Sequence, residues 1–399
     1  MHTKLSLLNV LFYLCVFSLS LNQYSAIFKS GEVNVYLFDL LIAVFVVYGM
    51  LVFLIKKQLT FPKSYIFFIA FTVIAGLSLV SKVGLLEGIQ LVASGMYFVR
   101  WVLYLLSGLV VFNMVKSSFI STQKLFTVFI ISGLFISLAG FVQLVLLPDF
   151  ETLDPVLGWD PHKNRLASTF FDPNFVGAYL TLCLVFVIEK LSVVIKAKDR
   201  NNFTPLLISS FVLITAIFLT FSRSAWLMLA VVVLIYGIFK YRLLLVLALI
   251  LVFSAYFFVP RVQTRLSGTT DPADSARFRL VSWGNTWEIA KDNPLLGVGF
   301  NVFRYAQKDY GYLTVDTFEN HSGAGADSSL LFILATTGVF GLATFMIGFC
   351  KNPSSNLLPL ITCVSLLVDS QFINSLFYPQ ILFLWLIVLG ISSSYSLRK

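Results

Sequence analysis

The chain has 399 residues, of which 58% are hydrophobic and only 12% are charged, and its mean hydropathy is +0.90. A soluble domain carries about 25% charged residues, so this composition excludes an ordinary soluble protein and indicates a polytopic membrane protein. The net charge of +9 would suggest nucleic acid in a soluble chain, but most Lys and Arg residues lie in short loops between apolar runs. They indicate membrane topology, and we expect no nucleic-acid partner.

Apolar runs long enough to cross a bilayer recur along the chain, and about twelve can be recognised if each span needs about 20 apolar residues. We therefore expect an all-α bundle, with transmembrane helices 1–9 in residues 1–259, a loop domain in residues 260–327 and transmembrane helices 10–12 in residues 328–399. The first run lacks a clear cleavage site and is expected to be retained. The runs are Leu5–Leu21, Val33–Ile55, Ser64–Val80, Met96–Val115, Leu125–Leu147, Phe175–Ile195, Pro205–Phe221, Ala225–Phe239, Leu243–Val259, Ser328–Phe349, Leu357–Ile373 and Phe377–Tyr395.

The basic residues predict the orientation, because Lys and Arg in short loops stay on the cytoplasmic side. They occupy every alternate connection and both termini, so both termini are expected to be cytoplasmic. The segment 260–327 then lies outside and is long enough to be exempt from the charge rule. Since a structureless loop of this length is improbable, we expect a small helical cap. The cytoplasmic groups are Lys4, Lys56 with Lys57, Lys116 with Lys124, Lys196 to Arg200, Lys240 with Arg242, Lys351, and Arg398 with Lys399.

Four charged residues fall toward the outer membrane boundary in this topology: Asp39, Arg100, Arg223 and Asp369. An arginine near hydrocarbon costs roughly 2.5–3.5 kcal/mol at a helix centre and is by default a functional-site candidate. Arg223 either closes a tight helical hairpin as an interfacial residue, or its planar guanidinium grips a phosphate group. Asp39 and Arg100 either contribute to a site at the outer leaflet or pair within the bundle.

Four segments carry motifs in a fixed order. In order, spacing and topology they resemble the O-antigen ligase and polymerase superfamily of bacterial cell-surface polysaccharide assembly, over nearly half of the chain. The segments are RLASTFFDPN at 165–174, TFSRSAW at 220–226, RLVSW at 279–283 followed by PLLGVGF at 294–300, and DSSLLFILATTGVFG at 327–341.

The resemblance implies a membrane glycosyltransferase whose donor is a glycan on undecaprenyl diphosphate, presented at the outer face of the bacterial inner membrane. A diphosphate leaving group gains negative charge as the glycosidic bond breaks, and fixed guanidinium groups stabilise such charge. The long spans are expected to form the groove for the polyprenyl tail. The candidate residues for binding the diphosphate or glycan are Arg165, Arg223, Arg279, Asn174, Gly297, Gly299 and Arg100.

The third motif predicts a helix over 276–291, with Leu280, Trp283 and Trp287 on one face. Pro294 is expected to end it. Gly297 and Gly299 then allow a tight turn whose backbone amides approach phosphate or sugar, or they form an ordinary turn.

The fourth motif departs from the family pattern, because ligase members carry a candidate catalytic His where this chain has Asp327. The nearest histidine is His321, in a Gly-rich stretch. Asp327 is the first candidate for the base that accepts the proton of an attacking sugar hydroxyl, since such a base needs fixed geometry before a matched pKa. His321 is the second candidate. The departure favours a polymerase over a ligase.

The sequence therefore predicts a polysaccharide polymerase that transfers a glycan from undecaprenyl diphosphate to another lipid-linked repeat unit. A ligase that transfers the glycan to lipid A core or another acceptor is the alternative, and a flippase is a third, disfavoured because the charges lie near one face and no internal repeat is visible. Membrane lipids, a separate flippase and a chain-length regulator are expected partners. No cofactor and no metal site is predicted, and Asp271 with Asp274 lie in a turn expected to be solvated.

The predicted topology can be tested by cysteine labelling in intact cells with an impermeant reagent. Cysteines introduced at Lys57 and Lys198 should stay unlabelled until the membrane is opened, whereas one introduced at Lys308 should be labelled from outside. Labelling at position 57 or 198 in intact cells would show that the predicted orientation is wrong.

Overall fold

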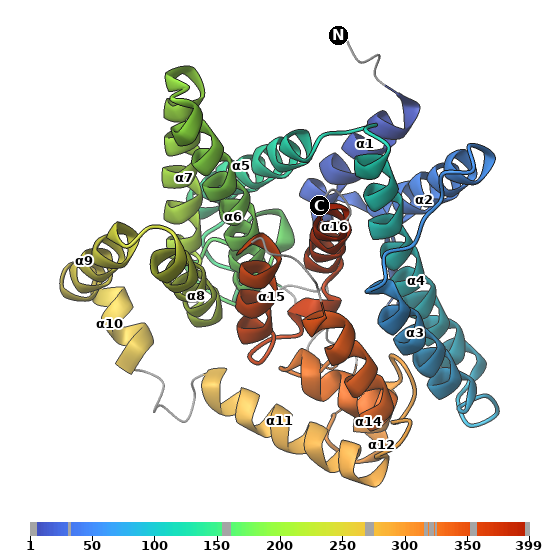
Figure 1. Ribbon diagram of the computed structural model, residues 1–399. Helices are drawn as coiled ribbons and strands as arrows, with labels where there is room; N and C mark the ends of the chain where they lie inside the picture. Colours follow the sequence, from blue (N-terminus) through green and yellow to red (C-terminus); the bar gives the residue numbers. More distant parts are fainter. Residues whose placement is uncertain are drawn as a thin grey trace.

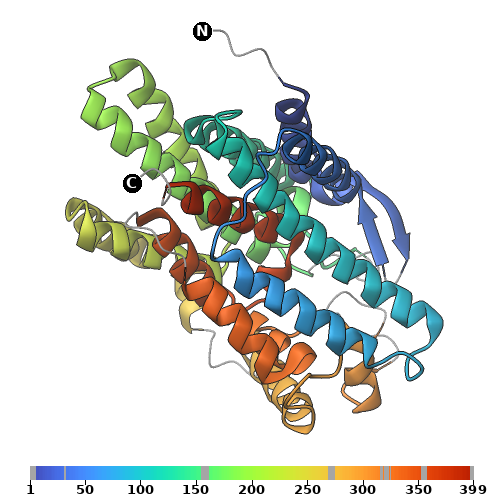
Figure 2. The ribbon, with the colours of Figure 1, turned by 45° about the vertical axis from the view of Figure 1, so that its right-hand side comes forward.

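A computed structural model describes residues 6–30, 33–153, 161–267, 275–314, 318, 323, 325–351 and 357–395. Over these residues the chain is a bundle of α-helices with one antiparallel pair of strands, β1 (Ala26–Ser30) and β2 (Val33–Tyr36), as Figure 1 and Figure 2 show. The helices are α1 (Leu7–Leu21), α2 (Leu37–Ile55), α3 (Tyr65–Val80), α4 (Gly88–Lys116), α5 (Thr122–Leu146), α6 (Pro173–Ala197), α7 (Arg200–Leu219), α8 (Arg223–Phe239), α9 (Leu243–Phe258), α10 (Pro260–Ser267), α11 (Ser275–Asp292), α12 (Phe303–Asp309), α14 (Ser329–Cys350), α15 (Leu357–Asp369) and α16 (Pro379–Tyr395).

Each apolar run predicted from the sequence overlaps one of the helices α1–α9 or α14–α16, but the run Val33–Ile55 was wrong at its start, because Val33–Tyr36 form β2 and pair with β1. By length and apolar composition, 7 of the described helices can cross a membrane, and α9 with α10 forms a further pair bent by 94°. The helices α3, α8, α15 and α16 are apolar but shorter. An all-α membrane protein is therefore supported, while the number of helices that cross the bilayer stays a prediction.

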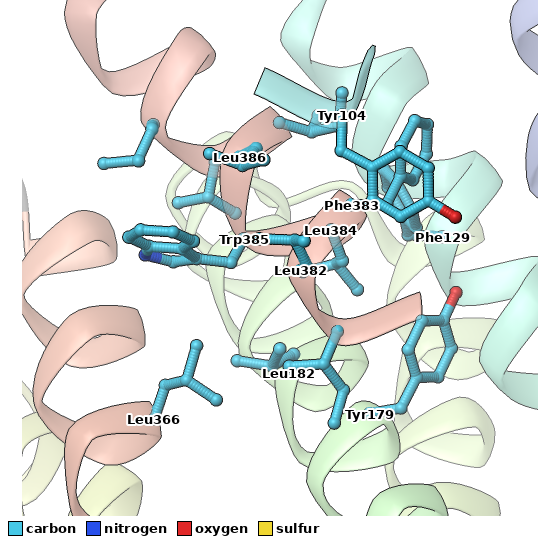
Figure 3. Close-up of a cluster of buried hydrophobic side chains, with 14 of the residues drawn as sticks. Tyr104, Phe129, Tyr179, Leu182, Leu366, Leu382, Phe383, Leu384, Trp385 and Leu386 are labelled. Atoms are coloured by element: carbon cyan, nitrogen blue, oxygen red, sulfur yellow. The ribbon is translucent and has the colours of Figure 1, made fainter. Parts of the chain in front are cut away.

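Helix α16 lies at the centre of the bundle and packs against α4, α6 and α15 (Figure 1). Figure 3 shows Phe383 and Trp385 of α16 among side chains from α4, α5, α6 and α15. Two glycines allow the closest contact, since a Cβ on Gly108 of α4 would lie 2.7 Å from the Leu386 carbonyl oxygen and one on Gly390 would lie 2.5 Å from that of Gly108. Small residues at such crossings let helix backbones approach within a membrane.

The segment predicted as a helical cap contains α10, α11 and α12. The helix expected over 276–291 is confirmed as α11, with an end near Pro294 as predicted. Ile289, Ala290 and Phe303 from this segment share a small buried cluster with Phe332 and Ala335 of α14. The segment therefore packs onto the transmembrane helices, and its division from them as a separate cap domain remains a prediction.

Helix α14 is broken at Gly338, whose φ of 67° and ψ of −172° are not helical. The segment 294–299 fills the break, because Val339 N–H donates to the Pro294 carbonyl at 2.8 Å and Val298 N–H donates to the Ala335 carbonyl at 2.8 Å. Gly299 N–H also donates to Thr336 O at 3.2 Å. The backbone groups freed by the break thus find partners, as they must in an apolar surrounding.

Gly338→Ala should destabilise the protein strongly, by about 2 kcal/mol or more, because the backbone conformation is nearly restricted to glycine. In addition, the new Cβ would lie 2.0 Å from the Leu295 carbonyl oxygen. Thermal unfolding in detergent measures the effect. The matched control is Gly284→Ala on α11, where a Cβ meets nothing within 4 Å and the helix propensity of Ala should leave stability unchanged or raised. Equal melting temperatures for the Gly338→Ala and Gly284→Ala variants would contradict the break at Gly338.

Candidate active site

Arg165 is held between two segments that are far apart in the sequence. Its Nε donates to the carbonyl oxygen of Thr220 at 2.9 Å and its Nη2 donates to Asn174 Oδ1 at 3.1 Å. The neighbouring Leu166 N–H donates to the Leu219 carbonyl at 2.9 Å. Gln143 Oε1 of α5 accepts hydrogen bonds from the N–H groups of Ala167 and Ser168, which fixes this part of the loop against α5. The first and second motifs are therefore joined directly.

The turn between α7 and α8 completes this junction. Ser222 caps α8 by accepting from Ala225 N–H at 3.4 Å, as expected for a serine at an N-cap. Its hydroxyl also donates to Asn174 Oδ1 at 2.8 Å, so the asparagine oxygen accepts from both Arg165 and Ser222. Arg223 is the first residue of α8, and its Nη1 donates to the carbonyl oxygen of Arg265 in α10 at 3.2 Å.

Asp172 caps the N-terminus of α6 beside Arg165. Its Oδ1 accepts from Asn174 N–H at 2.7 Å, and Pro173 begins the helix, a position that proline favours. Burial raises the pKa of Asp172, while the Asn174 amide and the guanidinium of Arg165 act in the opposite direction. The N-termini of α6 and α8 therefore both lie close to Arg165.

The third and fourth motifs are joined in the same way. Trp283 Nε1 on α11 donates to the carbonyl oxygen of Asp327 at 3.0 Å, and Asp327 N–H donates to Ser282 Oγ at 3.0 Å. Arg279, one turn earlier on α11, and the side chain of Asp327 are half-buried. Asp327 is thus held by its backbone immediately before the start of α14.

Asp369, the last residue of α15, connects the two halves of the site. It is fully buried, and among the described residues neither carboxylate oxygen has a hydrogen-bond partner. Its polar neighbours are the hydroxyls of Ser224 and Ser375, and it interacts electrostatically with Arg279 and Asp172. This placement follows from the packing of α15 against α8 and α6 (Figure 1). Two neighbouring carboxylates, Asp172 and Asp369, are thus flanked by Arg165 on one side and Arg279 on the other.

Arg100 belongs to a different network. Its Nε and Nη2 donate to the two Asp39 oxygens at 2.9 and 2.7 Å, and Nη2 also donates to the Asn34 carbonyl of β2 at 2.6 Å. Tyr104 donates to the same carboxylate at 2.7 Å. The pairing within the bundle that the sequence left open is therefore present, and the structure gives Arg100 a role in fixing β2 to α2 and α4 instead of a place among the motifs. The pair borders a cavity of about 560 Å³ with mainly apolar walls.

The backbone amides of Gly297 and Gly299 were candidates for binding phosphate, but in the structure they donate to other main-chain groups. Gly297 N–H donates to the Asn293 carbonyl at 3.1 Å, and Gly299 N–H donates to the Thr336 carbonyl at 3.2 Å. A Cβ on Gly297 would lie 2.3 Å from the Thr336 carbonyl carbon, and the φ of Gly297 is +69°. The structure thus favours the ordinary-turn interpretation, because the two glycines let the segment enter the break in α14.

The sequence singled out five of the residues that the structure brings into these contacts: Arg165, Asn174, Arg223, Arg279 and Asp327. It noted Asp369 only as a charge at the outer boundary and did not assign it to the site. It also missed Ser222 and Asp172, although a serine or aspartate directly before an apolar helix is a recognisable N-cap signal. His321 lies outside the described residues.

Comparison with known families gives one match. Residues 208–346, about a third of the chain, match the sequence model of the family described as O-antigen ligase. The matched region runs from within α7 to within α14 and contains the Arg223 turn, α11 and Asp327. A comparison with curated proteins gives no match. Residues 208–346 are thus similar to the O-antigen ligase family, and this match confirms the resemblance of the chain to the O-antigen ligase and polymerase superfamily.

Proposed function

We propose that this membrane enzyme of the O-antigen ligase and polymerase type is a polysaccharide polymerase. It transfers a growing glycan from undecaprenyl diphosphate to the sugar of another lipid-linked repeat unit, at the outer face of the bacterial cytoplasmic membrane. The observation that carries the proposal is that three motifs meet around one turn. Arg165 is hydrogen-bonded to the turn that carries Arg223, and the buried carboxylate of Asp369 lies beside Ser224 of that turn and interacts with Arg279.

The arginines supply what the leaving group needs. As the bond between the anomeric carbon and the phosphate oxygen breaks, the diphosphate keeps the electron pair and its negative charge increases. Guanidinium groups that are already held in place stabilise this charge without reorganising. Arg223 also begins α8, and the positive end of a helix dipole favours an anion at that position.

The base must accept the proton of the acceptor hydroxyl as its oxygen forms the new bond to the anomeric carbon. Asp327 is half-buried and has a fixed backbone, so its carboxylate can reach a substrate. Asp369 is completely buried and cannot contact the acceptor in this conformation. We therefore assign the base to Asp327, and to Asp369 the role of holding Arg279 and the Ser224 turn by its charge.

The polymerase is favoured over the ligase because Asp327 stands where ligase members carry histidine. The same arginines would serve a ligase, since both reactions release the same diphosphate. The two differ in the acceptor. Purified protein supplied only with lipid-linked repeat units should form longer lipid-linked chains if it is a polymerase, whereas a ligase would need lipid A core or another added acceptor.

Arg223→Lys should lower the turnover number with purified lipid-linked substrate almost as much as Arg223→Ala, by about 10²-fold. A lysine keeps the charge but not the planar fork that binds phosphate through two bonds. Arg277→Lys is the matched control, because Arg277 is exposed on α11 and should tolerate the change. If Arg223→Lys retains full turnover, charge alone is sufficient and the phosphate-binding role of this residue is wrong.

Asp327→Asn should reduce the turnover number by at least about 10²-fold, because the acceptor hydroxyl then lacks a base. His321→Ala should have a smaller effect. The exposed Asp309 on α12 offers a control, since Asp309→Asn removes a carboxylate from the same segment without touching the proposed site. A larger loss for His321→Ala, at equal protein level and stability, would move the base to His321 and support the ligase alternative.

A further inference from the structure

Helix α10 lies across the junction of the first two motifs although it belongs to neither. It follows α9 after a bend of 94° at the end of that helix. Arg261, in its first turn, donates through Nη1 to the Asn164 carbonyl oxygen at 2.5 Å and through Nη2 to that of Lys163. These are the two residues directly before Arg165. The planar fork of Arg261 thus holds the backbone from which the Arg165 side chain extends.

The same guanidinium stacks on the turn that carries Arg223. The Cζ atom of Arg261 lies 4.3 Å from the centre of the Phe221 ring. Phe221 has a φ of 47°, an unfavourable conformation for a bulky residue that persists only where surrounding contacts enforce it. It lies between Thr220, whose carbonyl accepts from Arg165, and Ser222, whose hydroxyl donates to Asn174. The conformation of Phe221 therefore determines where both of these groups point.

A third contact links α10 to Arg223 itself. The Arg265 carbonyl that accepts from Arg223 belongs to the last turn of α10, where carbonyl groups lack partners within the helix and the dipole is negative. Through Arg261 and this carbonyl, one short helix contacts the backbone before Arg165, the Phe221 turn and the Arg223 side chain.

We propose that Arg261 is a positioning residue that keeps the Phe221 turn in the conformation presenting Arg165 and Arg223 together. Its own Nη atoms are engaged with main-chain carbonyls and its face is stacked on a ring, so it acts through the other two arginines rather than on the substrate. The catalytic consequence rests on the proposed function, whereas the effect on the turn does not.

The effect on the turn can be measured without any substrate. Ser224 is 3% exposed, so a cysteine placed there should be protected from a water-soluble maleimide while the turn is closed. The exposed Cys350 is first replaced by serine, and the other cysteines are buried. Arg261→Gln should increase the labelling rate at position 224 by at least about 10-fold, and Arg261→Lys should do so nearly as much because lysine lacks the fork. Arg277→Gln is the control and should leave the rate unchanged.

The transfer reaction is then followed for the same Arg261 variants in protein that keeps the natural Ser224. Arg261→Gln should lower kcat by about 10²-fold with little change in KM, as expected when groups that stabilise the transition state are misplaced. Phe221→Leu, which removes the stacked ring, should give part of this loss, and adding it to Arg261→Gln should give less than the sum.

Unchanged labelling in Arg261→Gln and in Arg261→Lys overturns the proposal, whatever happens to turnover. Faster labelling with reduced kcat supports both the positioning role and the proposed function. Faster labelling with normal turnover supports the action of Arg261 on the turn. It also means that the turn does not contribute to the reaction, which contradicts the proposed function and not the positioning role. Thermal unfolding identifies any variant that has lost its fold. If Arg261→Gln does not fold, the milder variant Phe221→Leu is used for the same labelling and turnover measurements.

Discussion

The proposed site depends on the two hydrogen bonds by which Arg165 joins the loop before α6 to the turn before α8. The Thr220 carbonyl and the Asn174 side chain hold the guanidinium, and the same asparagine oxygen accepts from Ser222. Since each buried polar group must find a partner, loss of any member leaves another unsatisfied. The helices α6 and α8 therefore begin at a common point, and α15 ends against both of them. This meeting of helix ends creates the polar surrounding in which charges are tolerated.

Within the described residues, the charges in this region form two neighbouring carboxylates with an arginine on either side, and not a hydrogen-bonded ion pair. Arg165, Asp172, Asp369 and Arg279 each influence the next electrostatically, but Asp369 makes no hydrogen bond within the described residues. The Asp39–Arg100 pair differs, because two hydrogen bonds, a tyrosine hydroxyl and a strand carbonyl satisfy it. A satisfied pair of this kind serves the packing of helices. An incompletely satisfied buried carboxylate next to arginines is more typical of a site that binds a ligand or performs chemistry.

The helices could be predicted from the sequence because only a helix satisfies its own backbone within a bilayer, so apolar runs of sufficient length leave few alternatives. Arg165, Asn174 and Arg223 were found through motifs, yet their mutual contacts could not be predicted, since they join segments about 50 residues apart that only packing brings together. The break at Gly338 was missed because the apolar pattern of α14 continues through it. The same break explains why Gly297 and Gly299 do not offer their amides to a ligand. The sequence indicated only the expected position of Asp369 near the membrane boundary, because nothing in its local sequence indicates Arg279 as a neighbour.

We propose that the ends of α6, α8, α11 and α15 that meet near Asp369 form the binding site for a lipid-linked diphosphate. A cryo-electron microscopy structure of the protein with an undecaprenyl-diphosphate-linked oligosaccharide would test it most directly. We expect density for the diphosphate within hydrogen-bonding distance of Arg223 and Arg279, with the first sugar directed toward Asp327. Density for the diphosphate at the Asp39–Arg100 cavity, or at the opposite ends of these helices, would show that the diphosphate binds elsewhere and that this site is wrong.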